Sequence, residues 1–250
     1  MAFCTMQFHG SSLNKKSSMN LLIPETPGPW PVLVLLHGLS DDHTIWCRRT
    51  SLERYLDGTN LLVVMPDGHR NWYVNDPRNG GLAYEDHIVQ DVIGFVDRTF
   101  DTVADRSARA VAGLSMGGYG AIMLGLKHPE LFSAACGHSS AVDFVHGDGR
   151  KRDIYQEMVA ALSAEQYDVY KLAEAAVESG RAPALRLDCG VDDFLIEANR
   201  RFHAHLESIA LAHEYAEYPG AHDWAYWDEH IQESLSFVEA NLPAMRTGGD

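Results

Sequence analysis

A serine set between glycines, at positions 113–117, is the feature of this sequence best suited to chemistry. The segment reads Gly-Leu-Ser-Met-Gly, a G-x-S-x-G motif centred on Ser115. An apolar run typical of a buried strand precedes it and a helical pattern follows it, which is the context of a nucleophile elbow. In so sharp a turn the glycines relieve crowding, while the strained serine presents its hydroxyl at the end of the sheet. Ser115 is therefore the predicted nucleophile.

A serine hydroxyl needs a base to take its proton and an acid to orient that base. In folds with this elbow, the chain order is serine, acid, histidine. The segment DCGVDDFL places Asp192 and Asp193 after one apolar run, and YPGAHDWAYW places His222 after the next. We favour Asp193 because a Gly-x-x-Asp loop is usual for the acid, with Asp192 as the alternative. The sequence thus predicts a triad of Ser115, Asp193 and His222.

Hydrolysis also needs hydrogen-bond donors for the oxyanion of the tetrahedral intermediate. The backbone N–H of Met116, directly after the nucleophile, is one predicted donor. The second is expected from the segment LLHGLSDDHTIW, where His37 and Gly38 end a strand pattern. The amide of Leu39 is the favoured second donor, and that of Ser40 is the alternative.

Aromatic residues lie near the loops that should surround this serine. They are Trp46, Trp72, Tyr73 and Trp224. An aromatic wall for a small acyl group is one interpretation, so these four are the predicted substrate-binding residues. The other interpretation is that the rings pack against the loops and brace them.

Metal chemistry is the alternative for the acidic and histidine-containing segments DDHTIW and HDWAYWDEH. Neither has the H-E-x-x-H pattern or a comparable ligand spacing. We therefore expect no metal and no cofactor.

Short apolar runs predict the strands that position these residues. They cover residues 1–8, 18–23, 31–38, 60–68, 109–115, 132–140, 184–190 and 213–220. A polar turn separates the first two, which favours an antiparallel start. The continuous apolar runs that follow are typical of strands buried on both faces.

Amphipathic segments between these runs predict helices over residues 84–100, 194–210 and 228–242, and a helix that begins at Gly120 and stops near Pro129. The alternation of strand and helix favours a mostly parallel sheet with helices on both faces, built as one domain over residues 1–250. Residues 139–182 are longer and more polar than a connection requires. They predict a small helical cap over the site, the alternative being an appendage without contact to the ligand.

Composition limits the partners. The chain has 250 residues and a formal net charge of −15, which argues against a nucleic-acid surface. No signal-peptide pattern or membrane-length apolar run occurs, so we expect a cytoplasmic protein without a membrane partner. Four well-separated cysteines predict reduced, mostly buried thiols. The expected partner is a small ester, and homo-oligomerisation is compatible with these features.

Six segments together resemble the esterase D group of α/β-hydrolases, which includes tributyrin-type carboxylesterases, S-formylglutathione hydrolases and, more distantly, feruloyl esterases. They are LLHGLSDDHTIW, MPDGHRNWYVND, YEDHIVQDVIGFVD, GLSMGGYGAIMLGLKHPELF, GVDDFL and HDWAYWDEHI, and the resemblance runs from Phe8 to Leu242. It implies the α/β-hydrolase fold and the roles assigned above to Ser115, Asp193, His222, Leu39 and Met116.

One departure from that group concerns the substrate. Where formylglutathione hydrolases resemble SGLTC, this chain has HGLSD, so Asp41 stands in place of a cysteine. The departure favours a serine carboxylesterase for short-chain esters over a glutathione thioesterase. The alternatives are a formylglutathione-type thioesterase, an acyltransferase, or a binding module without catalysis on the same fold.

Overall fold

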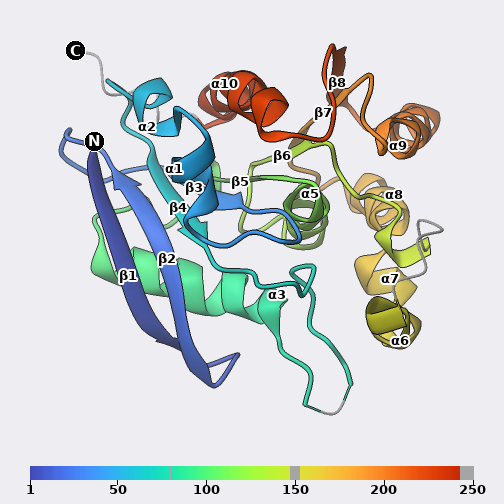
Figure 1. Ribbon diagram of the computed structural model, residues 1–250, viewed down its shortest axis with the longest axis horizontal. Helices are drawn as coiled ribbons and strands as arrows, with labels where there is room; N and C mark the ends of the chain where they lie inside the picture. Colours follow the sequence, from blue (N-terminus) through green and yellow to red (C-terminus); the bar gives the residue numbers. More distant parts are fainter. Residues whose placement is uncertain (79, 147–152, 243–250) are drawn as a thin grey trace.

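A long antiparallel hairpin begins the chain and forms one edge of the central sheet (Figure 1). The computed structural model describes residues 1–78, 80–146 and 153–242. Strand β1 (Ala2–Gly10) pairs along its length with β2 (Lys15–Ile23), and β2 pairs antiparallel with β4. The predicted antiparallel start is confirmed.

Six parallel strands form the rest of the sheet, in the order β4-β3-β5-β6-β7-β8. They are β3 (Val32–Leu36), β4 (Leu62–Pro66), β5 (Arg109–Leu114), β6 (Ala134–His138), β7 (Ala184–Gly190) and β8 (His213–Tyr218). Each lies in a run that the sequence predicts as a strand. Because they are parallel, the segments that follow β5, β7 and β8 leave the sheet at the same edge.

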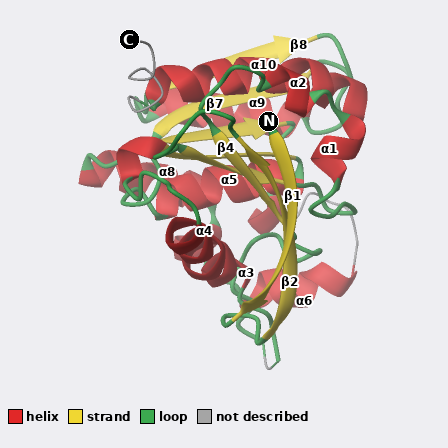
Figure 2. Ribbon diagram, turned by 90° about the vertical axis from the view of Figure 1, so that its left-hand side faces the viewer, coloured by secondary structure: helices red, strands yellow, loops and turns green. Residues whose placement is uncertain are grey.

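Helices cover both faces of the sheet. On one face lie α1 (Ile45–Arg49), α2 (Leu52–Tyr55) and α10 (Trp224–Asn241), packed on side chains such as Leu33, Leu35 and Val63. On the other lie η1 (His87–Val92, a π-helix), α4 (Ile93–Thr99), α5 (Met116–Lys127), α8 (Val169–Ser179) and α9 (Ile196–Ser208). Figure 2 shows α10 and α4 on opposite sides of the strands. The expected α/β-hydrolase fold is confirmed.

Two helices next to the predicted site begin earlier than their apolar pattern indicates. Helix α5 starts at Met116, directly after the elbow, instead of at Gly120. Helix α10 starts at Trp224 instead of Asp228, because the Asp223 carboxylate accepts hydrogen bonds from the N–H groups of Ala225 and Tyr226. The helix expected over residues 84–100 begins with α3 (Tyr84–Asp86) and contains the π-helical segment η1.

The segment between β6 and β7 divides into two parts. Near β6 it contains η3 (Phe144–His146) and α6 (Asp153–Ala161). Helix α7 (Ala164–Tyr167) leads into α8, which packs against α5 and α9 as part of the layer on the sheet. Any cap is therefore limited to the part before α7.

A 3₁₀ turn, η2 (Arg106–Ala108), precedes β5. Within the described residues, no helix has the length and apolar character of a membrane span.

Candidate active site

The turn from β5 into α5 holds Ser115 in a strained conformation. Its φ is 54° and its ψ is −115°, in a region that residues other than glycine rarely adopt. A Cβ on Gly113 would lie 2.4 Å from the carbonyl oxygen of Gly117, and one on Gly117 would lie 2.6 Å from that of His37. Backbone segments therefore meet around the elbow too closely for larger residues, as expected from the motif.

A continuous hydrogen-bonded relay leads from Ser115 into the protein. Nε2 of His222 lies 3.0 Å from Oγ of Ser115, and Nδ1 of His222 lies 2.8 Å from Oδ2 of Asp193. A carboxylate can only accept, so Nδ1 carries the ring proton and Nε2 is free to accept the hydroxyl proton. The structure brings the three predicted residues together. Asp192, the alternative acid, points to solvent.

The surroundings of Asp193 keep its carboxyl group ionised. Its side chain is 0% exposed. Burial alone would raise its pKa, yet the pKa lies below the usual range because His222, the amide of Leu195 and the hydroxyl of Ser139 donate hydrogen bonds to it. An ionised carboxylate at this position accepts the Nδ1 proton of His222 and fixes the orientation of the ring.

The loop after β3 is braced from below. Nδ1 of His37 donates to the carbonyl oxygen of Gly38 (2.7 Å), and Nε2 accepts the N–H of Gly68 (2.8 Å). The hydroxyl of Tyr73 lies 3.0 Å from both the amide nitrogen and the carbonyl oxygen of His37. These bonds hold the loop in one conformation beside Ser115.

This loop passes directly over Ser115. A Cβ on Gly38 would lie 2.8 Å from Cδ1 of Leu114, so glycine permits the loop to approach the end of β5 next to Ser115. Leu39 and Ser40 follow and line the same pocket as Ser115, while Met116 begins α5 on its other side. The two backbone segments expected to supply oxyanion donors therefore meet at Ser115. The donor roles of Leu39 and Met116 remain predictions.

A pocket of about 1050 Å³ opens above Ser115 and is large enough for a small organic substrate. The residues after β3, β4, β6, β7 and β8 line it, together with α6. Aromatic side chains contribute much of the wall: Trp72, Phe144, Phe194, Trp224 and Trp227.

The structure corrects half of the predicted aromatic wall. Trp72 and Trp224 line the pocket as predicted. Trp46 and Tyr73 are buried in the protein, with exposures of 1% and 0%, and do not line it. Their polar atoms bond to the backbone instead: Nε1 of Trp46 donates to the carbonyl oxygen of Leu36. These two residues brace the loops, which was the alternative interpretation.

Two aromatic residues that the sequence reasoning missed surround His222. The Phe194 ring lies 4.3 Å from the imidazole, and the Trp227 ring lies 4.9 Å away, nearly perpendicular to it. The sequence contained a signal for each residue. Phe194 directly follows Asp193, and Trp227 lies one helical turn after Trp224, so each could have been placed near His222.

The residues considered for a metal are dispersed. Within the described ranges, no three histidine, cysteine or acidic side chains form a group that could hold a metal ion. The Asp228 carboxylate accepts a hydrogen bond from the N–H of Ser51, and His230 contacts Glu233.

The sequence of this chain is similar to those of known esterases. The family model named Esterase matches residues 10–238. The acetyl esterase of Caldicellulosiruptor saccharolyticus is 23% identical to this chain, over 95% of this chain and 98% of its own length.

Two solved structures from Staphylococcus aureus are similar over nearly the whole chain. FphF, a fluorophosphonate-binding serine hydrolase, is 31% identical, with 95% of this chain and 98% of that chain covered and a TM-score of 0.86. The S-formylglutathione hydrolase FrmB is 30% identical, with the same coverage of both chains and a TM-score of 0.85.

Proposed function

We propose a mechanism and a substrate class for this chain, which belongs to the esterase family and is a serine carboxylesterase. Ser115 is the nucleophile, His222 the general base and acid, and Asp193 the residue that orients the histidine. The relay of hydrogen bonds from Ser115 through His222 to Asp193, at the floor of a pocket, is the observation that carries this proposal.

The reaction has two halves. Oγ of Ser115 attacks the ester carbonyl carbon while Nε2 of His222 takes the hydroxyl proton, and the imidazolium then protonates the departing alcohol. The acyl group stays on Ser115. A water molecule next gives a proton to Nε2 of His222 and attacks the acyl carbon. The bond from that carbon to Oγ of Ser115 then breaks as the imidazolium returns the proton to Oγ, which releases the carboxylic acid and restores the serine.

The oxyanion of each tetrahedral intermediate lies between the loop after β3 and the start of α5. We assign its donors to the amides of Leu39 and Met116, each worth on the order of 3 kcal/mol of barrier. The N-terminus of α5 adds a favourable dipole for negative charge at this point. The hydrogen bonds from Tyr73 and Gly68 to His37 support the assignment, because they fix the loop that carries the Leu39 amide. A donor stabilises the intermediate only if it is already in place.

A short acyl group and a neutral alcohol form the substrate class that we propose. The acetyl esterase of C. saccharolyticus supports the short acyl group. Asp41 lines the pocket as a partly buried carboxylate, which disfavours anionic substrates. A thioester substrate is the second candidate, because FrmB is similar to this chain over nearly its whole length.

Location and partners belong to the same proposal. We place the protein in the cytoplasm, acting on a small-molecule ester as a monomer or homo-oligomer, with residues 141–146 and α6 as the described parts of a cap over the pocket. Four free cysteines and the net charge of −15 support a reducing compartment and no nucleic-acid partner.

Hydrolysis of p-nitrophenyl esters from acetate to octanoate, with Ser115→Ala as the blank, tests the proposal. We expect the fastest turnover on the shortest chains, no turnover by the variant, and a transient acyl adduct on the wild-type chain by mass spectrometry. S-formylglutathione serves as a parallel substrate. A higher kcat/KM on it would replace the ester class by a thioester, whereas turnover by Ser115→Ala would refute the mechanism.

A further inference from the structure

We propose that the turn after β6, residues 138–141, positions the nucleophile and the acid relative to each other, with Ser139 as its main positioning residue. This inference rests on the proposed function, because it concerns the triad assigned above. It assigns a role to Ser139, which does not line the pocket.

The backbone of this turn holds the nucleophile from both sides. The N–H of Ser115 donates to the carbonyl oxygen of His138 at 2.9 Å, and the N–H of Ala141 donates to the carbonyl oxygen of Ser115 at 3.1 Å. The N–H and the carbonyl oxygen of Ser115 are therefore both hydrogen-bonded to this turn. A shift of the turn would move the strained serine with it.

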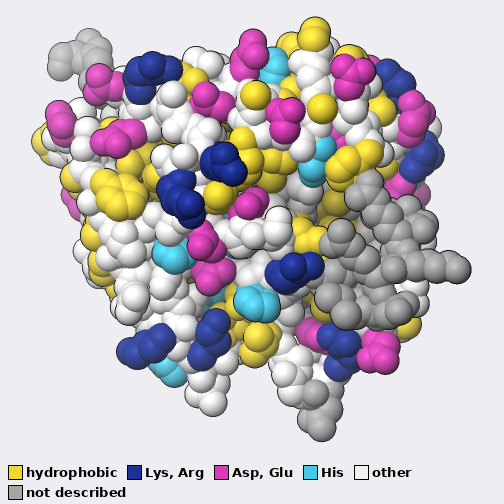
Figure 3. Space-filling model, in the orientation of Figure 1, with side chains coloured by type: hydrophobic (Ala, Val, Ile, Leu, Met, Phe, Trp, Pro, Cys, Tyr) yellow, Lys and Arg dark blue, Asp and Glu magenta, His cyan; other side chains and the backbone are white. Residues whose placement is uncertain are grey.

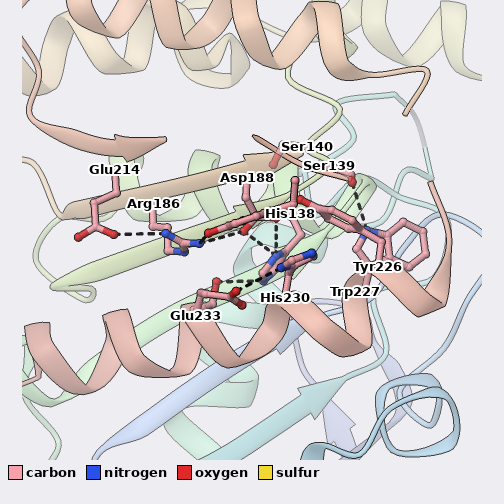
Figure 4. Close-up of polar contacts among 12 residues, drawn as sticks. His138, Ser139, Ser140, Arg186, Asp188, Glu214, Tyr226, Trp227, His230 and Glu233 are labelled. Carbon is pink, nitrogen blue, oxygen red and sulfur yellow. Dashed lines mark hydrogen bonds and ion pairs between the residues drawn. The ribbon is translucent and has the colours of Figure 1, made fainter. Parts of the chain in front are cut away.

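The side chain of Ser139 links the same turn to the acid. Nε1 of Trp227 donates to Oγ of Ser139 at 3.2 Å (Figure 4). The same hydroxyl faces the Asp193 carboxylate, where it lowers the pKa of that group, and it also faces the thiol of Cys189. The Trp227 ring packs edge-on against His222, so one pair of side chains touches both the acid and the base.

Ser139 occupies this position in a strained conformation. Its φ is 46° and its side chain is fully buried. Glycine adopts a positive φ without this strain, whereas serine persists in it only where the surroundings hold it in place. Its N–H provides part of this restraint by donating to the carbonyl oxygen of Asp188 at 2.8 Å.

A buried polar cluster behind the site anchors the turn to β7 and α10 (Figure 4). Nδ1 of His138 lies 3.0 Å from Oδ1 of Asp188, and Nε2 lies 3.0 Å from Oγ of Ser234. The hydroxyl of Tyr226 donates to Asp188 at 2.9 Å, and Arg186 lies 3.7 Å from the same carboxylate. His138 and Asp188 are 0% exposed, so this cluster is an anchor and not a second reaction centre.

Three variants distinguish the effect of the Ser139 hydroxyl from the effect of its strained backbone conformation. Ser139→Ala and Ser139→Gly both delete the hydroxyl, but only the glycine also relieves the strained φ. Trp227→Phe keeps a ring beside His222 and deletes the N–H donor. Ser17→Ala is the matched control, because Ser17 is another buried serine whose hydroxyl bonds to a histidine, far along the chain from the triad.

The main readouts are kcat and KM on p-nitrophenyl acetate and the rate of labelling by a fluorophosphonate. Loss of one hydrogen bond to a charged group predicts a fall in kcat of about tenfold for Ser139→Ala and Ser139→Gly, with little change in KM. Trp227→Phe should lose less, and Ser17→Ala should match the wild type. Ser139→Gly should unfold at a temperature equal to or above that of Ser139→Ala.

The pH profile separates positioning from general damage to the fold. His222, on the loop after β8, and Cys189, on β7, are the titratable groups that face Asp193, while Asp188 and His138 lie behind the turn. Burial keeps the pKa of the Cys189 thiol far above neutral. Without the Ser139 donor, the Asp193 carboxylate is more basic and stabilises the imidazolium. The acid limb of kcat/KM should therefore move to higher pH.

Two results would overturn the positioning role. One is wild-type kcat in Ser139→Gly, which would mean that the hydroxyl contributes nothing. The other is a lower kcat in Ser139→Ala with an unshifted pH profile, which would mean only a smaller folded fraction. If Ser115→Ala were itself active, the proposed function would fail first, so the two failures are distinguishable.

Discussion

Ser17, His87 and Asp91 repeat, in another part of the molecule, the hydrogen-bonded order of Ser115, His222 and Asp193. Oγ of Ser17 lies 3.1 Å from Nε2 of His87, whose Nδ1 lies 3.0 Å from Oδ2 of Asp91. The corresponding distances in the candidate active site are 3.0 and 2.8 Å. The two groups of residues are nearly identical in their contacts.

Their surroundings differ in every respect that matters for catalysis. Ser17 lies within a regular strand, β2, and His87 is fully buried, with its ring stacked on Phe8. Asp91 also accepts hydrogen bonds from the N–H groups of Ser11 and Ser12 in the turn of the first hairpin. This group therefore ties the hairpin to η1 and has a structural role.

The comparison shows that a serine, histidine and aspartate in hydrogen-bonded order do not suffice for an active site. Ser115 differs by a strained elbow that presents its hydroxyl, by a pocket above it, and by two backbone segments that meet beside it. These features come from the loops at one edge of the sheet. Surface charge does not mark the site, because acidic and basic side chains are interspersed across the face in Figure 3.

The strongest test of this difference exchanges each serine for alanine. Ser115→Ala should lower turnover of p-nitrophenyl acetate by at least about 10³-fold and leave the fold intact, because it removes the nucleophile. Ser17→Ala should leave turnover unchanged and lower stability by about 1 kcal/mol, the net value of one hydrogen bond. Steady-state kinetics and urea unfolding of both variants provide the measurement. Equal loss of turnover in both would remove the distinction between the two groups.

Replacing His222 should have an effect on turnover nearly as large as replacing Ser115. His222→Ala should cost about as much as Ser115→Ala, and the double variant should lose no more than either single variant, because the residues act as a unit. The activity of each variant is compared at saturating ester. If the losses multiplied in the double variant, the two residues would not share one mechanism.

Wild-type activity should also fall as the solution becomes acidic, since a protonated imidazole cannot accept the serine proton.

The two neighbouring aspartates sharpen the assignment of the acid. Asp193→Asn should lower kcat by roughly 10²-fold or more, because an amide favours the wrong tautomer of the histidine. Asp192→Asn is the matched control, one residue away and exposed to solvent, and should keep its activity. The reverse pattern would exchange the roles of the two residues.

The smallest expected effect concerns stability and its dependence on pH at His87. Burial lowers the pKa of His87 below the ordinary value of 6.5, even though Asp91 acts in the opposite direction. As the pH falls below 6.5, the unfolded chain therefore binds this proton before the folded chain does, so the free energy of unfolding decreases. His87→Gln should show a flatter decrease in urea titrations below neutral pH. An unchanged slope would mean that His87 titrates alike in both states.

Much of the fold was predictable because local patterns and tertiary structure agree. The six parallel strands lie within the predicted apolar runs, and their parallel order follows from the alternation with helices. Strands β1 and β2 extend beyond their apolar runs, to Gly10 and from Lys15, because pairing with each other continues into the polar residues. The helix boundaries were less accurate. The periodicity of apolar side chains places the start of α10 at Asp228, whereas the hydrogen bonds of the Asp223 side chain place it at Trp224.

The aromatic residues show where pattern reasoning stops. Trp72 and Tyr73 are adjacent in the sequence, and both have a positive φ. Nevertheless, Trp72 lines the pocket while Tyr73 lies beneath the loop after β3, with its hydroxyl on His37. Neighbouring residues of one type therefore have different roles, and no spacing rule separates them.

The sequence by itself determined the nucleophile elbow, the order of serine, acid and histidine along the chain, and the fold that brings strand ends together. These depend on residue type and local spacing, which a linear pattern contains. Only the tertiary structure decided which aromatic rings reach the pocket, and that Trp227 lies between Ser139 and His222 and contacts both. It also decided that the group at His87 is buried. Such properties depend on packing between segments far apart in the chain, where a rotation of one side chain exchanges a pocket wall for a core contact.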